Sequence, residues 1–65
     1  MQHYKVDLNN MSEEERRHAL EILKLNSFDW DQLIPFENHV YSFYWNSNED
    51  ILSATGLSTD RVEPL

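Results

Sequence analysis

The stretch HVYSFYW, residues 39–45, is the densest run of β-forming side chains in the chain. Aromatic and β-branched residues pack well on a pleated, half-buried surface, so this composition predicts a strand. Successive side chains of a strand point to opposite faces of its sheet. The predicted strand therefore carries large side chains on both faces: Tyr41, Phe43 and Trp45 on one, and Val40, Ser42 and Tyr44 on the other.

The residues before this strand give a less regular pattern. Phe28 and Trp30 share a parity that Gln32 interrupts, while Asp29 and Asp31 lie opposite. We predict a loop through Asp31, a short strand over 33–36 that Pro35 restricts to an edge or a strand end, and a turn at 37–38. The alternative is a single long loop over residues 28–38.

Two further elements are expected in the first half of the chain. Apolar and polar side chains alternate over residues 3–8, and this period predicts a half-buried strand with Tyr4, Val6 and Leu8 on one face. Ser12 followed by Glu15 forms a capping box, which predicts a helix over residues 13–25. Asn26 is expected to end that helix in a left-handed conformation.

The C-terminal third predicts a second, shorter helix. Ser47 or Asn48 is the expected cap, with Glu49 and Asp50 in the first turn. Gly56 is expected to end the helix in a left-handed conformation, and a Schellman ending would bring Leu57 against Leu52. Residues 61–63 are long enough for a stub of strand, which Pro64 stops.

The order of these elements predicts the fold class. Strand, helix, strand, strand, helix and a final strand is a βαββα(β) α+β arrangement, the ferredoxin-like order in abbreviated form. We expect one domain over residues 1–65, built as a small two-layer sandwich with both helices on one face of a short sheet. The strand–helix–strand crossover is expected to be right-handed.

Composition excludes several classes of chemistry. The 65 residues contain no cysteine, which removes disulfides, thiol catalysis and cysteine-based metal sites. The three histidines are scattered, and His39 and Ser42 have opposite strand parity, so no catalytic pair forms. Asp29 and Asp31 are too few for a magnesium site and are interpreted as a solvated acidic loop. We expect no enzymatic activity, no metal and no cofactor.

Charge narrows the partner class. Twelve acidic and five basic residues give a formal net charge of −7. Nucleic acids and anionic membranes attract clustered Lys and Arg, so neither is an expected partner. A protein with a basic surface fits better, because opposite potentials steer encounter. The N-terminus lacks the apolar core of a secretory signal, and a cytoplasmic location is expected.

The aromatic residues supply the candidate binding surface. Seven of the eight lie between Phe28 and Trp45, and two short helices can cover only one face of the sheet. Aromatic side chains on the uncovered face would form a contact patch, since Tyr and Trp are enriched at interface hot spots. The candidate partner-binding residues are the anchors Trp30, Tyr41, Tyr44 and Trp45 with an acidic rim of Asp29, Asp31, Glu49 and Asp50.

These features favour a non-enzymatic module that occupies a partner's surface as an inhibitor or adaptor. One alternative is a homodimer whose aromatic sheet faces pair. Another is a nucleic-acid mimic whose carboxylates block a basic groove. In its short, acidic, cysteine-free and aromatic-rich profile the chain resembles the small accessory proteins of phages and mobile elements that bind host proteins. That likeness implies a binding role and assigns no residue.

Overall fold

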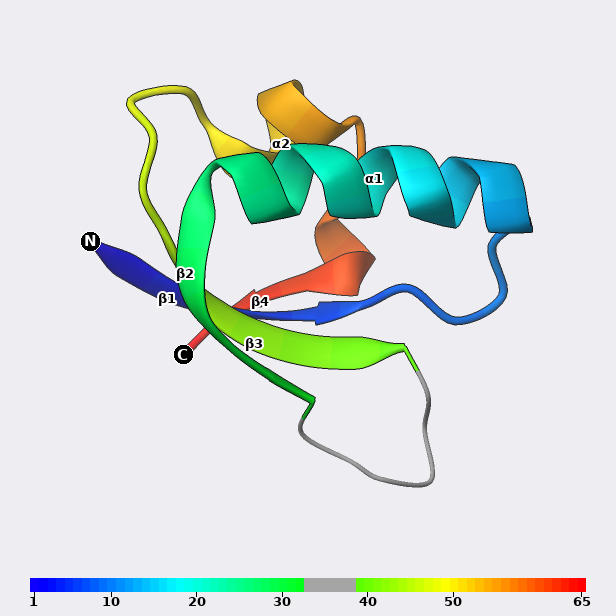
Figure 1. The fold of residues 1–65 in the computed structure, drawn as a ribbon, viewed down its shortest axis with the longest axis horizontal. Helices are drawn as coiled ribbons and strands as arrows, with labels where there is room; N and C mark the ends of the chain where they lie inside the picture. Colours follow the sequence, from blue (N-terminus) through cyan, green and yellow to red (C-terminus); the bar gives the residue numbers. More distant parts are fainter. Residues whose placement is uncertain (33–38) are drawn as a thin grey trace.

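The computed structural model of the chain describes residues 1–32 and 39–65, which form a four-stranded sheet and two helices (Figure 1). The elements in chain order are β1 (Gln2–Asp7), α1 (Glu13–Leu25), β2 (Ser27–Gln32), β3 (Val40–Trp45), α2 (Ile51–Thr55), a 3₁₀ turn η1 (Thr59–Arg61) and β4 (Val62–Pro64).

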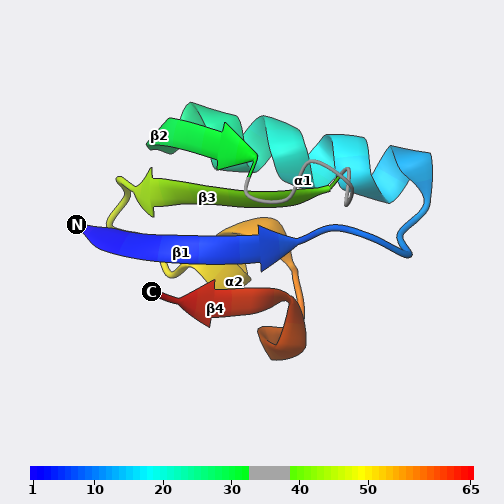
Figure 2. The ribbon, with the colours of Figure 1, turned by 90° about the horizontal axis from the view of Figure 1, so that it is seen from below.

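The sheet order is β2-β3-β1-β4, and every neighbouring pair is antiparallel. β3 lies between β1 and β2, so β1 and β2 run parallel to each other. β1 lies between β3 and β4, so these two strands are also parallel to each other. In Figure 2 both helices lie behind the sheet, β1 and β2 point one way, and β3 and β4 point the other way. With this geometry both crossovers, from β1 through α1 to β2 and from β3 through α2 to β4, are right-handed. The predicted α+β class, the ferredoxin-like order and the placement of both helices on one face are confirmed.

Helix α1 begins as its capping box predicts. The Glu15 amide donates to the Ser12 hydroxyl, and the Ser12 amide donates to the Glu15 carboxylate. Its end differs from the prediction. Asn26 has φ −119° rather than a left-handed conformation, and its side-chain amide donates to the carbonyl of Ile22. With ψ 19°, this backbone is neither left-handed nor extended, and β2 starts at the next residue.

Helix α2 begins at a different cap from the predicted ones and ends, as predicted, at Gly56. Asp50 is the cap, and its carboxylate accepts from the amides of Leu52 and Ser53; the predicted caps Ser47 and Asn48 lie outside the helix. Gly56 ends it at φ +74°, as predicted. The Gly56 amide donates to the Leu52 carbonyl, which is the simpler left-handed ending, and the Leu57 amide turns instead to the Thr55 hydroxyl.

The prediction of a loop through Asp31 is wrong, because residues 27–32 form the edge strand β2. The pairing of β2 with β3 shifts by one residue between Phe28 and Asp31, and within this bulge Asp29 has φ +56°. Aspartate tolerates the left-handed region better than most side chains, so the bulge forms without glycine. The predicted strand over residues 33–36 and the turn at 37–38 lie outside the described residues.

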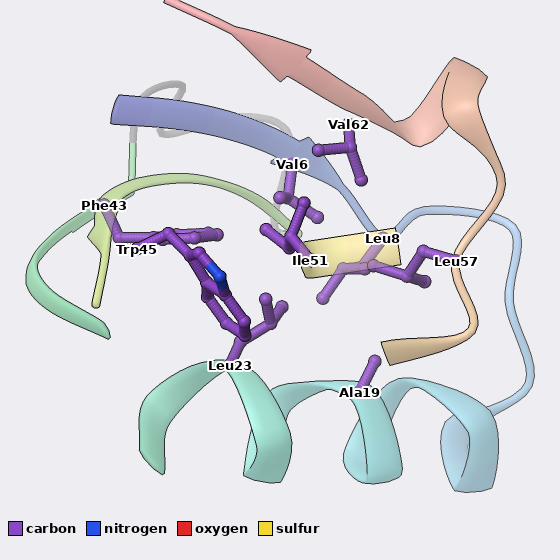
Figure 3. Close-up of a cluster of buried hydrophobic side chains, with 9 residues drawn as sticks. All are labelled: Val6, Leu8, Ala19, Leu23, Phe43, Trp45, Ile51, Leu57 and Val62. Atoms are coloured by element: carbon purple, nitrogen blue, oxygen red, sulfur yellow. The ribbon is translucent and has the colours of Figure 1, made fainter. Parts of the chain in front are cut away.

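The hydrophobic core lies between the helices and one face of the sheet (Figure 3). Phe43 and Trp45 of β3 enter it from the sheet, and Ala19 and Leu23 enter it from α1. Tyr4, Trp30 and Tyr41 pack against its margin. The full cluster of buried side chains comprises Val6, Leu8, Ala19, Leu23, Phe43, Trp45, Ile51, Leu57 and Val62.

The core predicts a contrast between two leucines of α1. Leu23 is fully buried, whereas Leu25 is 85% exposed. Leu23→Ala should lower the free energy of unfolding by about 2–5 kcal/mol, because it deletes buried methyl groups and leaves a cavity. Leu25→Ala is the matched control and should change it by less than about 0.5 kcal/mol. Urea unfolding measures both, and equal losses would contradict this packing of α1.

A second prediction concerns the end of α2. A Cβ at Gly56 would meet no atom within 4 Å, so substitution there tests backbone conformation alone. Gly56→Ala should cost about 1 kcal/mol in thermal or urea unfolding, because alanine pays a steric penalty at positive φ. Gly56→Asn should cost less, since asparagine tolerates this conformation. An unchanged stability in Gly56→Ala would contradict the left-handed ending.

Candidate functional site

One face of the sheet is not covered by the helices (Figures 1 and 2). The register of β1, β2 and β3 determines which side chains belong to this open face. It places Tyr44 beside His3 and Phe28, and Ser42 beside Lys5 and Asp31. Val40 and Ser42 are almost completely buried, so Tyr44 is the most accessible of the three β3 side chains on this face.

Three rings form a continuous stack at that end, which we call the aromatic ladder: His3, Tyr44 and Phe28. The His3 and Tyr44 rings have centroids 4.4 Å apart and planes 12° from parallel. The Tyr44 and Phe28 rings are 5.6 Å apart and 20° from parallel. Phe28 is 38% exposed, while His3 and Tyr44 are half-buried. The ladder thus crosses three adjacent strands and is partly exposed to solvent.

Trp30 and Tyr41, two of the predicted anchors, lie on the helix side of the sheet. The Trp30 ring stacks on Phe43 at 4.8 Å and meets Tyr41 edge-on at 5.3 Å. Lys24 of α1 places its ammonium 5.9 Å from the centroid of the Trp30 ring. The Trp30 indole also donates to the Ser27 hydroxyl at 2.8 Å. Both residues are half-buried at the margin of the core, away from the aromatic ladder.

Trp45, the third predicted anchor, belongs to the core. It is only 6% exposed, and its indole nitrogen donates to the Glu49 carbonyl at 2.8 Å. This bond ties the end of β3 to the loop that leads into α2. Trp45 therefore has a structural role, and of the four predicted anchors Tyr44 alone lies on the open face.

The predicted acidic rim divides into two pairs. Asp31 lies on the open face and Asp29 at the bulge of the same edge strand, and both are exposed. Glu49 and Asp50 are also exposed, but they lie in the connection between β3 and α2, where Asp50 caps the helix. Only the first pair adjoins the aromatic ladder.

Sequence reasoning missed Phe28 and His3. The bulge explains Phe28: Phe28 and Trp30 share a parity in the sequence, but the extra residue between them sends the two rings to opposite faces. His3 lies on β1, which is an interior strand between β3 and β4. The alternation over residues 3–8 already put His3 opposite the core, and this signal could have found it.

A shallow depression lies beside β1, β4 and the turn η1. It is lined by Lys5 and Asp7 of β1 and by residues 59–64. Lys5 pairs with Glu63 at 3.5 Å, and Arg61 donates to the carbonyls of Asp7 and Asn9. A hydrogen bond from Ser58 lowers the pKa of Asp60, with a further contribution from the adjacent Arg61 charge. The depression's basic groups are thus already engaged within the chain.

Neither metal-ligand geometry nor a membrane-spanning element is found among residues 1–32 and 39–65. Within them no three His, Asp or Glu side chains gather closely enough to hold a metal ion. Their helices are also too short and too polar to cross a bilayer.

Comparison with protein-family models, curated proteins and solved structures found no match to this chain. The assignment of a site therefore depends on its own geometry. That geometry singles out the aromatic ladder and the two aspartates beside it.

The different settings of the two tryptophans generate a prediction. Trp45→Phe removes a buried indole and its bond to Glu49, and should lower the free energy of unfolding by about 1–3 kcal/mol. Trp30→Phe is the matched control: it also removes an indole donor, but at a half-buried position, and should cost less than about 1 kcal/mol. Denaturant unfolding measures both variants. Equal costs would contradict the placement of Trp45 in the core.

Proposed function

We propose that this protein is a non-enzymatic binding module that occupies a basic surface of a partner protein through the end of its sheet that carries the aromatic ladder. The observation that supports the proposal is the position of that ladder. Three stacked rings lie on the sheet face that the helices leave open, and one of them is 38% exposed.

Rigid aromatic surface suits an interface. Tyr and Phe bury a large area on binding while losing few rotatable bonds, and Tyr is enriched among hot-spot residues. Stacking restricts the rings of His3, Tyr44 and Phe28 before a partner arrives, so little side-chain entropy remains to be lost.

Charge favours a basic partner over a neutral one. The formal net charge is −7, and Asp29 and Asp31 stand on the strand that carries Phe28. A negative potential around an apolar patch accelerates encounter with a positive surface and disfavours acidic competitors. The revised contact set is therefore Tyr44, Phe28 and His3, bordered by Asp29 and Asp31; Trp45 is omitted because it is buried.

Photo-cross-linking in an extract of the cells that encode the protein tests the proposal. Benzoylphenylalanine in place of Phe28 should give a covalent adduct with one protein, and the same group in place of His18 should not. His18 is the matched control because it is exposed on α1, on the opposite layer. Tyr44→Ala should abolish the adduct, since it removes the central ring of the ladder.

Other outcomes would overturn the proposal in distinguishable ways. Adducts of the same mass at positions 28 and 18 would mean that the open face has no special role. An adduct with a second copy of the chain would replace the proposal with the homodimer. A nucleic-acid-binding protein whose adduct is displaced by its own nucleic acid would identify the mimic.

Kinetics with the purified cross-linked partner supply a further prediction. The association rate constant should fall severalfold when NaCl is raised from ~50 to ~500 mM, because salt screens the attraction between charged surfaces. Tyr44→Ala should act mainly on the dissociation rate constant. Surface plasmon resonance measures both constants. A salt-independent association rate would contradict the basic-partner assignment.

A further inference from the structure

The aromatic ladder ends with an uncovered ring at the edge of the sheet. Tyr44 covers one face of the Phe28 ring, at a centroid distance of 5.6 Å. Phe28 belongs to β2, which has a neighbour on one side only, so the other face of its ring points away from the sheet. Among the described residues no second ring and no cation lies over Phe28.

Two carboxylates beside that ring have no counter-ion among the described residues. Asp31 follows Phe28 on the open face, opposite Ser42 where Phe28 is opposite Tyr44, which places the two side chains about 7 Å apart along β2. Asp31 and Asp29 are exposed, and neither forms an ion pair within the described parts of the chain.

Two lysines of the chain are already engaged near this corner of the sheet. Lys5 pairs with Glu63 on the same open face, and Lys24 lies over the ring of Trp30 on the other side of β2. Phe28 and Asp31 thus combine two features that bind a cation, an open ring face and a carboxylate, and no described residue supplies a cation to either of them.

We propose that this corner of the sheet binds an arginine side chain of the partner, whose guanidinium stacks on the outer face of Phe28 and pairs with the Asp31 carboxylate. The inference rests on the proposed function, whose binding surface it describes in more detail. Arginine fits better than lysine because its planar group can stack on a ring and donate in-plane hydrogen bonds to a carboxylate at the same time. The guanidinium would continue the ladder as a fourth layer.

Short peptides test this inference without knowledge of the partner. We would titrate ¹⁵N,¹³C-labelled protein with acetyl-Gly-Arg-Gly-Arg-Gly-amide and with the peptide in which lysine replaces arginine. The arginine peptide should bind about 3–10 times more tightly, which is the scale of one exposed cation–π contact with a bidentate pair. Its chemical-shift changes should centre on the Phe28 ring and the Asp31 carboxyl carbon.

Matched variants separate the ring from the charge. Phe28→Leu keeps an apolar side chain and should bring the two peptides to equal affinity. Asp31→Asn should weaken the arginine peptide about 3–5 times, whereas Glu21→Gln removes the same charge from exposed α1 and should have little effect. Circular dichroism checks that each variant is folded. We expect no large loss of stability, because the substituted side chains are exposed.

Two results would overturn the inference. Equal affinity of the wild-type protein for both peptides would mean that charge alone attracts them. Equal weakening by Asp31→Asn and Glu21→Gln would mean that the attraction is not local to this corner. Either result, together with a specific cross-link at position 28, would leave the proposed binding function intact. A specific arginine contact without any cross-link would instead count against the function alone.

Discussion

The antiparallel pairing of β3 with β1 is the constraint on which the rest of the structure depends. It runs over six residue pairs, from Gln2 opposite Trp45 to Asp7 opposite Val40. Side chains alternate across a strand, so a slip of one residue would exchange the two faces. This register puts Phe43 and Trp45 beneath the helices and Tyr44 on the open face. Both the core and the candidate binding surface follow from it.

The bulge in β2 is the second feature that determines which side chains lie on each face of the sheet. Without the extra residue, Phe28 and Trp30 would face the same way, and the sheet would carry either a bare Trp30 or a buried Phe28. With it, Trp30 packs between Phe43 and Lys24 while Phe28 joins Tyr44. The bulge also interrupts an exposed edge and carries an aspartate there, features that discourage edge-to-edge aggregation. One local irregularity thus shapes both the core and the candidate binding surface.

A chain of 65 residues can form only a small core, and here the aromatic residues serve two purposes. Phe43 and Trp45 fill the space between the layers, and the Trp45 indole holds the loop before α2 through the Glu49 carbonyl. His3, Tyr44 and Phe28 contribute little to this core. Their rings stack on one another on a face that has no helix, and this arrangement is the basis for the proposed contact with another molecule.

Features that depend on neighbouring residues could be predicted from the amino-acid sequence. The Ser12–Glu15 capping box, the left-handed Gly56 and the alternation over residues 3–8 and 39–45 each involve groups a few positions apart, and so the helix over 13–25 and the order of elements could be predicted. In the same way, the alternation over residues 39–45 assigned Tyr44 to one face of the strand and Tyr41, Phe43 and Trp45 to the other.

The sequence could not show which of those two faces the helices cover, because both carry apolar side chains; the folded arrangement of the layers was needed for that. It also decided the bulge at Asp29, since that depends on hydrogen bonds between β2 and a strand that follows it in the chain. Hence Trp45, a plausible anchor in sequence, is a core residue, and Phe28 and His3 join Tyr44 from distant positions. Pairing between residues that are far apart along the chain is what brings the candidate site together.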